Sequence, residues 1–352
     1  MSKPCRIGIL GHFCFEKELF NGQTVKTKMF TSALETELGK SAVVKIDTHG
    51  GIKALPKVCL NVLKAMVTCR AVVMLPAHNG VKVFTPILVI LGKFFRRRIY
   101  YVVIGGWLPE MTACKKWLAF LLKKFDGIYV ETSSMEKALS KQGFNNVLMM
   151  PNFKDLAILD AKELVYTTKE PFPFCTFSRV MKEKGIEDAV TAITQLNMQA
   201  GRTVATLDIY GQIDSNYTER FNRLRQNCPP FIEYKGVVAP NESVPVLKNY
   251  FALLFPTYYQ GEGFAGTLLD AMAAGVPVIA SDWKYNKEIV KDGKTGVLIH
   301  SNLLTEIEQV LAQPDQFNRL KPFCLQEAQN YTPKTVITPV VTFITKQVSG
   351  KL

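Results

Sequence analysis

The residues best able to do chemistry lie between Tyr258 and Gly296. A glycine-rich turn, residues 261–266, follows one expected strand and precedes an expected helix. The first amides of a helix carry the positive end of its dipole and bind anions, and small residues let the backbone approach a ligand closely. Glu262 lies in this turn and Asp270 lies eight residues later, so two carboxylates can flank a diphosphate and accept hydrogen bonds from sugar hydroxyls. The alternative is an ordinary strand–turn–helix, with Glu262 in water and Asp270 supporting the helix.

Two cations follow the first expected strand of the second half of the chain. Arg179 is placed at the end of that strand, and Lys184 near the start of the next helix. Side chains at these positions point into one crevice, where they can neutralise a diphosphate and stabilise it as it leaves. Considered alone, an Arg and a Lys at this spacing are ordinary surface charge.

The elements that position these residues alternate between short β-rich runs and longer helical stretches. Alternation of this kind predicts βαβ units and parallel sheets, with ligands at the carboxyl ends of the strands. The pattern restarts after a polar stretch near 155–173, so we expect an α/β protein with two doubly wound domains facing a central cleft. The first would span 1–165 plus a returning helix within 334–352, and the second 166–333. The expected strands are 7–10, 43–47, 71–75, 99–104, 127–131, 147–150, 174–178, 206–210, 232–235, 252–255, 276–280 and 297–299, and the expected helices of the first half are 24–38, 56–67, 84–95, 113–125 and 134–142.

The net charge of +13 is confined to the first half of the chain. Residues 1–150 carry 22 Lys+Arg and 9 Asp+Glu, whereas residues 151–352 carry 21 of each. Such an excess fits nucleic acid, an anionic membrane surface or a phosphorylated substrate. Phe84–Arg98 and Cys114–Lys124 combine apolar side chains with basic ends, which suits helices lying against a membrane interface. The alternative is that both are core helices with basic tips in water.

Other features restrict the class of protein. The longest apolar stretch, around Ile87–Leu91, is far shorter than the ~20 residues of a membrane-spanning helix. The N-terminus shows no signal-peptide pattern, and the eight cysteines are scattered without a Cys-x-x-Cys pair. These features predict a cytoplasmic protein with reduced thiols. No Asp-x-Asp ends a strand, so no metal site is expected.

Taken in order along the chain, these motifs resemble a known family. They are Arg179, Lys184–Gly185, Tyr234–Val238, Phe255–Pro256, Glu262 to Asp270, Ala271–Val278, Glu288 and Asp292–Gly296. The set is similar to the retaining GT-B glycosyltransferases (group 1, or family 4, type) that carry two acidic residues eight apart. The likeness covers essentially the whole chain and is strongest over 174–300. It implies the GT-B fold, in which two Rossmann-like domains face a cleft.

The resemblance also implies roles for individual residues. Glu262 would contact the donor sugar, and Asp270 the ribose hydroxyls. Arg179 and Lys184 would hold the diphosphate, which makes these two and Glu262 the expected catalytic residues. The chain departs from the family at Asp270, where Glu is usual and reaches ~1.5 Å further. The remaining donor-binding positions are the amides of Gly263, Phe264, Ala265 and Gly266, and the backbone of Gly236, Val237 and Val238 beside the base.

In the first half the family has a glycine-rich loop where Asn21–Thr27 stands, and Gly22 would contribute to donor binding. This run looks like members that assemble bacterial capsule and exopolysaccharide. Many relatives place a His on the acceptor side after the fourth or fifth strand, but Ile104–Trp107 occupies that place here. The acceptor-side candidates are His12 and His78, which follow expected strands, and Trp107, whose ring can serve as a platform for an acceptor sugar. Each has an ordinary structural role as its alternative.

The expected reaction is retaining, metal-independent transfer of a sugar from a nucleoside diphosphate to a lipid-linked saccharide. UDP, the most frequent nucleotide in the family, is the expected one, and no further cofactor is required. The protein would act at the inner face of the plasma membrane as a peripheral enzyme of capsular polysaccharide biosynthesis, without nucleic acid. Two alternatives stay open: a nucleoside-diphosphate-sugar epimerase of the same fold, and a non-catalytic protein that binds polysaccharide or nucleic acid.

Overall fold

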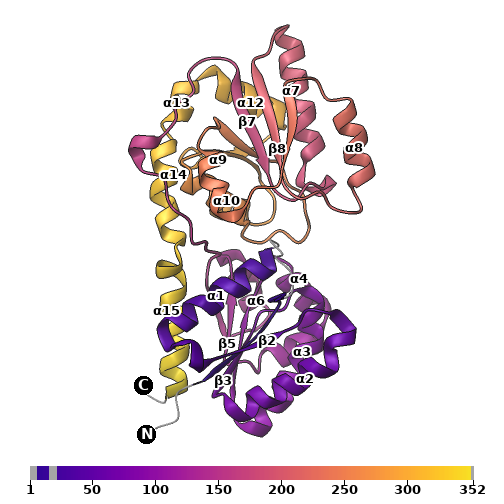
Figure 1. The fold of residues 1–352 in the computed structure, drawn as a ribbon, viewed down its shortest axis with the longest axis vertical. Coiled ribbons are helices and arrows are strands. Elements are labelled where there is room, and N and C mark those ends of the chain that lie inside the picture. The colour runs from indigo at the N-terminus through magenta and orange to yellow at the C-terminus, as the bar shows by residue number, and fades with distance from the viewer. Residues whose placement is uncertain (1–5, 16–21, 350–352) are drawn as a thin grey trace. The chain divides into compact units, whose positions relative to one another are not determined.

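The chain divides into two compact α/β units. The computed structural model describes residues 6–15 and 22–349. Unit 1 is the described part of Met1–Asp155 together with that of Thr332–Leu352, and unit 2 is Leu156–Tyr331. In Figure 1, unit 1 carries the indigo and purple elements and the yellow C-terminal helix.

Unit 1 is built on a parallel sheet whose strands are short apolar runs. Its order, in the described residues, is β2-β1-β3-β4-β5-β6. Most of these side chains are buried, because helices cover both faces of the sheet. The strands are β1 (Ile7–Gly11), β2 (Val43–Asp47), β3 (Ala71–Met74), β4 (Arg98–Val102), β5 (Gly127–Val130) and β6 (Val147–Met149).

Two groups of helices cover the two faces of this sheet. Ile7 and Ile9 point toward α1 (Gly22–Leu38) and α15 (Pro333–Ser349), with which they share one core. A Cβ placed on the intervening Gly8 would point the other way, toward Ala65 of α2 (Gly51–Thr68). On that second face α3 (His78–Phe95) contacts both α2 and α5 (Lys116–Leu122), as Figure 1 shows for α2 and α3. The remaining helices are α4 (Leu108–Cys114) and α6 (Ser133–Lys141).

Unit 2 repeats the same design with its own parallel sheet. The described strand order is β12-β11-β10-β7-β8-β9. The strands are β7 (Phe172–Phe177), β8 (Ala205–Tyr210), β9 (Ile232–Gly236), β10 (Ala252–Phe255), β11 (Val278–Ser281) and β12 (Gly296–Ile299). The helices are α7 (Ile186–Ala200), α8 (Thr218–Gln226), α9 (Ser243–Leu247), α10 (Gly266–Ala273), α11 (Asn286–Ile289), α12 (Leu303–Ala312), α13 (Pro314–Asn318) and α14 (Lys321–Ala328).

Two sequence expectations are corrected by the structure. The single helix expected over 113–125 is divided between α4 and α5, because Lys115 leaves the helical conformation and serves as the boundary of both. The second unit begins at Leu156, earlier than the expected 166. Leu156 packs against the core of unit 2, and the Leu159 N–H donates to the carbonyl of Ala273, so this stretch folds with unit 2. Within the described residues, none of the helices combines the length and the apolar content needed to cross a membrane.

A buried lysine in unit 2 gives a testable pH dependence. Lys321 is almost fully buried, and its Nζ donates to the carbonyl oxygen of Tyr250 at 3.0 Å. Burial lowers the pKa of Lys321 from 10.5 to about 8. Between these values the unfolded chain holds a proton that the folded chain has released, so the contribution of Lys321 to stability rises with pH.

We therefore expect Lys321→Met to lose this rise, since methionine keeps the apolar stem and removes the ammonium. Between about pH 7.5 and about pH 9.5, the unfolding free energy of the wild type should gain about 2 kcal/mol relative to the variant. Urea unfolding of both proteins at the two pH values measures the difference. Parallel pH profiles would contradict the assignment.

Candidate functional site

A buried ion pair lies at the carboxyl ends of two neighbouring strands of unit 2. Glu262 stands in the turn between β10 and α10, and Lys184 in the 3₁₀ turn Lys182–Lys184 before α7. Lys184 Nζ lies 2.5 Å from Glu262 Oε2, and the hydroxyl of Thr257 donates to the same oxygen at 2.9 Å. The side chains of Lys184 and Glu262 are only 12% and 7% exposed. The pair is thus largely shielded from water, which strengthens its electrostatic interaction.

The backbone around this pair explains how it is held. Gly185 follows Lys184 with φ +71°, and a Cβ placed on it would lie 2.3 Å from the carbonyl oxygen of Pro256. The Tyr258 N–H donates to the carbonyl of Glu183 at 2.8 Å, and the Thr257 hydroxyl oxygen lies 3.2 Å from the same carbonyl oxygen. The turn that carries Lys184 is therefore fixed directly onto the end of β10.

Aromatic rings complete the surroundings of the ammonium. Lys184 Nζ lies 5.4 Å from the ring centre of Phe255 and 5.3 Å from that of Tyr259. Both distances are in the range of cation–π attraction. An anionic ligand arriving here would meet a cation that is already oriented and mostly desolvated, which is the arrangement that stabilises developing negative charge.

Arg179 occupies a different place beside the same strand. Its Nη1 lies 3.4 Å from Oδ2 of Asp214, which follows β8, and its side chain is 51% exposed. In the sheet, β7 lies between β8 and β10. Arg179 and Lys184 thus flank the end of β7 on opposite sides, each beside a carboxylate from the segment that follows a neighbouring strand.

Asp270 lies in surroundings unlike those of Glu262. It is buried within α10, and its Oδ1 accepts a hydrogen bond from the hydroxyl of Ser243 at 2.9 Å. A ribose hydroxyl bound at Asp270 would share that carboxylate with Ser243. The turn residues Gly263, Phe264 and Ala265 are also buried, and the Phe264 ring packs against the Tyr331 ring with centres 5.0 Å apart.

The expected base-binding backbone stands at the end of β9. Gly236 adopts a left-handed conformation, with φ +84° and open space around its Cα. Its carbonyl accepts a hydrogen bond from the Gly211 N–H at 2.8 Å. Val237 is exposed and Val238 partly so, which leaves their backbone available to a ligand.

In unit 1, His12 belongs to a polar cluster at the ends of β1 and β2. Its Nδ1 lies 2.7 Å from Thr24 Oγ1 and its Nε2 3.1 Å from Nδ1 of His49. Burial lowers the pKa of His12, and His49 lowers it further, whereas Asp47 raises it. The cluster therefore favours a neutral His12. Gly22 is the exposed first residue of α1, and the expected turn before it, at Asn21, lies outside the described residues.

The other two acceptor-side candidates lie together. The rings of His78 and Trp107 meet edge to face with centres 5.2 Å apart. Trp107 Nε1 donates to the carbonyl of Ile104 at 2.9 Å, which fixes the indole ring. This pair follows β3 and β4, whereas His12 follows β1.

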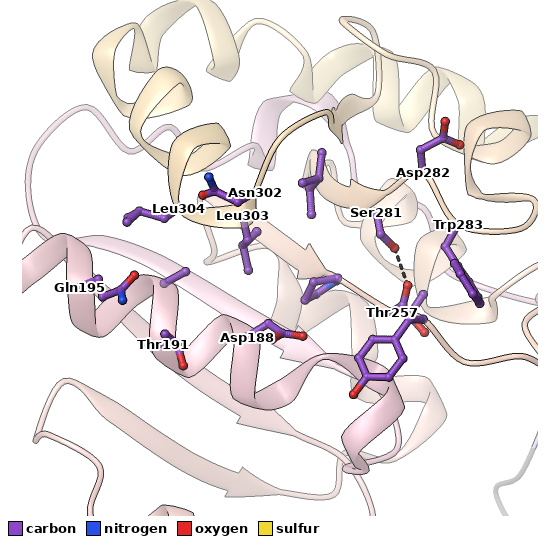
Figure 2. Close-up of a pocket in the computed structure, with 14 residues that line it drawn as sticks. Asp188, Thr191, Gln195, Thr257, Ser281, Asp282, Trp283, Asn302, Leu303 and Leu304 are labelled. Atoms are coloured by element: carbon purple, nitrogen blue, oxygen red, sulfur yellow. Dashed lines mark hydrogen bonds between the residues drawn. The ribbon is translucent and has the colours of Figure 1, made fainter.

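A separate groove of about 520 Å³ lies between α7 and α12. Figure 2 shows its side chains, including Asp188, Thr257 and Trp283, and the 2.5 Å hydrogen bond from Ser281 to the carbonyl of Thr257. Thr257 links the groove to Glu262, but neither Lys184 nor Glu262 lines it. The groove therefore lies beside the ion pair and does not enclose it.

Sequence reasoning missed the partners that hold the candidate residues. Thr257, Asp214, Ser243 and His49 were not singled out, although three of them come soon after expected strands. The rule that carboxyl ends of parallel strands meet at one edge could have linked His12 with His49, and Arg179 with Asp214. Ser243 lies on a helix and carried no such signal. The described residues contain no group of three His, Cys, Asp or Glu side chains suited to a metal ion.

Comparison with known proteins points to one family. Residues 162–323 match the family model described as glycosyl transferases group 1. The chain is 25% identical over 227 residues to the GtfA subunit of a UDP-N-acetylglucosamine–peptide N-acetylglucosaminyltransferase of Streptococcus pneumoniae. That match covers 61% of this chain and 44% of the relative, so the chain spans less than half of the length of that protein. A GDP-mannose-dependent alpha-(1-6)-phosphatidylinositol monomannoside mannosyltransferase of Mycobacterium tuberculosis is 29% identical over 143 residues, covering 39% of this chain and 36% of the relative.

Solved structures show the same fold. The Anabaena protein Alr3699/HepE, crystallised with UDP, superimposes with a TM-score of 0.71 at 14% identity, covering 98% of this chain and 100% of that one. Pneumococcal GtfA with UDP and GlcNAc gives 0.61 at 20% identity, covering 82% and 58%. These likenesses confirm the expected GT-B fold class of two Rossmann-like α/β domains.

Proposed function

Residues 162–323 form a domain of the glycosyl transferases group 1 family, and from this premise we propose that the chain transfers a sugar from a nucleoside diphosphate to an acceptor hydroxyl. The observation that carries the proposal is the shielded Lys184–Glu262 pair at the ends of β7 and β10. A carboxylate beside an oriented ammonium suits a ligand that presents sugar hydroxyls and a diphosphate together.

The proposed chemistry is retaining and needs no metal. The bond between the anomeric carbon and the diphosphate oxygen breaks, and the acceptor oxygen bonds to the same face of that carbon. Lys184, Arg179 and the amides of residues 263–266 stabilise the departing diphosphate. The leaving phosphate oxygen takes the proton of the acceptor hydroxyl, so no side chain has to act as nucleophile. Glu262 holds the donor sugar.

UDP is the proposed nucleotide. The pneumococcal relative is named for a UDP sugar, and the Anabaena structure contains UDP, whereas the mycobacterial relative is named for GDP-mannose. The proposal does not specify the donor sugar, which ligand screening would identify.

We expect a UDP sugar to raise the melting temperature of the protein, because a ligand at about a hundred times its Kd adds about 2.7 kcal/mol to stability. Differential scanning fluorimetry with UDP, GDP and ADP sugars measures the shift. Uridine, which lacks the diphosphate, is the control and should shift the transition much less. No shift with any sugar nucleotide would contradict the proposal.

The proposed acceptor is a lipid-linked saccharide at the inner face of the plasma membrane, in the assembly of a capsular or related polysaccharide. Two facts support it. The whole net charge of +13 lies in residues 1–150, which suits an anionic surface. The mycobacterial relative is named as acting on a phosphatidylinositol mannoside, which is a lipid acceptor.

A further inference from the structure

The outer face of three neighbouring helices of unit 1 is both apolar and basic. The helices α2, α3 and α5 each bury one stripe inside unit 1, for example Val62, Leu88 and Leu118. Each also presents large apolar side chains to water. These exposed residues are Ile52, Leu60, Leu63 and Val67 of α2, Val83, Ile90 and Phe94 of α3, and Trp117 and Phe120 of α5, which together we call the outer face.

The exposed side chains follow helical periodicity, so they form stripes and not scattered points. Leu60, Leu63 and Val67 are spaced by three and four residues along α2. Ile90 and Phe94 share one side of α3, where they are 68% and 78% exposed. Contiguous apolar stripes are normally buried in a globular protein, and in the part of unit 1 that the structure describes these outer stripes stay exposed.

The charge of the same segment is almost entirely positive. Residues 51–124 contain thirteen Lys and Arg but a single acidic residue, Glu110. The helices α2, α3 and α5 themselves contain none. Lys57 and Lys64 are exposed among the apolar residues of α2, and Lys124 lies 4.9 Å from the centre of the exposed Phe120 ring. Basic side chains bordering apolar ones match the headgroups and acyl boundary of an anionic bilayer.

From this juxtaposition we propose that the outer face is a docking surface for an anionic lipid bilayer, with α2, α3 and α5 lying along the interface. A second copy of this chain is disfavoured as the occupant, because pairing the face with itself would bring two basic surfaces together. Six of its nine apolar residues are aliphatic and offer no stacking to nucleic-acid bases, so the face suits acyl chains better than a nucleic acid, which is bound through rows of aromatic rings. This inference rests on the proposed function and deepens it, because the bilayer would be the source of the lipid-linked acceptor.

Vesicle flotation with two kinds of variant tests the surface. The apolar variant is Ile90→Ser with Phe94→Ser and Phe120→Ser, and the charge variant is Lys57→Glu with Lys64→Glu. The wild type should float with vesicles of equal parts phosphatidylglycerol and phosphatidylcholine, and not with phosphatidylcholine alone. Each variant should bind the anionic vesicles about tenfold or more weakly, since each Lys near the surface and each buried apolar side chain contributes substantially.

Matched controls come from α15, which covers the opposite side of the sheet. Phe343→Ser removes an exposed aromatic ring there, and Lys334→Glu with Lys346→Glu makes the same change of charge. Both control proteins should float like the wild type. Equal flotation of the outer-face variants and the controls overturns the proposal, as does dimerisation of the wild type through this face, measured by analytical ultracentrifugation.

Measuring donor binding with the same protein preparations tests the docking surface separately from the transferase proposal. The outer-face variants should keep the melting-temperature shift produced by a UDP sugar, which also shows that they are folded. A wild type that responds to the UDP sugar but ignores anionic vesicles overturns the docking surface and leaves the transferase proposal standing.

Discussion

Lys184→Met is expected to reduce sugar transfer by about a hundredfold to a thousandfold, the usual cost of removing one preorganised group that stabilises a developing anion. The ammonium of Lys184 lies 2.5 Å from Glu262 and close to two aromatic rings, so no water replaces it easily. Release of UDP in the presence of acceptor measures the rate. Lys182→Met is the matched control, because Lys182 is exposed on the same 3₁₀ turn and should be dispensable.

A loss of activity in this variant has to be separated from a loss of folding. Removing Lys184 leaves the buried Glu262 carboxylate without its cation, which costs about 3–5 kcal/mol in comparable buried pairs. The double variant Lys184→Met with Glu262→Gln removes both charges. We expect it to recover most of the unfolding free energy while transfer stays lost. Near-normal turnover in Lys184→Met, or recovery of transfer in the double variant, would refute a role for Lys184 in holding the diphosphate.

Gly185→Ala is expected to destabilise unit 2 by several kcal/mol, on the order of a severe core mutation. Two effects add at this position. The left-handed φ of +71° costs ~1 kcal/mol for a residue with a Cβ. The added Cβ would also lie 2.3 Å from the carbonyl oxygen of Pro256, a backbone atom that cannot turn aside. Moving α7 away from β10 would shift Lys184 from Glu262, so transfer should fall together with stability.

Gly201 provides the control that divides these two effects. It ends the same helix with φ +64°, and its Cβ would meet nothing within 4 Å. Gly201→Ala should therefore cost only the conformational ~1 kcal/mol. Urea unfolding of the two variants measures the difference. Equal destabilisation would show that Pro256 yields to the extra atom, and that close packing at Gly185 does not position the site.

Several properties of this protein follow from the sequence by itself. The strands β2 and β10 have the predicted limits, and most other predicted strands differ by one or two residues at an end, because continuous apolar runs bounded by polar turns are local signals. The ordered set of motifs from Arg179 to Gly296 likewise sufficed to predict the family. Charge is a property of composition, so the basic first half needed no coordinates.

Contacts between distant residues were decided only by the tertiary structure. Lys184 and Glu262 are 78 residues apart, and they meet because β7 and β10 are neighbours in the sheet although other strands separate them in sequence. Nothing local to Asp270 indicates that Ser243 would hold it. The same holds for the outer face: periodicity shows that α3 has apolar residues on two sides, but only the packing of α3 between α2 and α5 decides that Leu88 is buried and Phe94 exposed. Local sequence patterns determine each helix and strand, whereas strand pairing and side-chain burial depend on residues that are distant in the sequence.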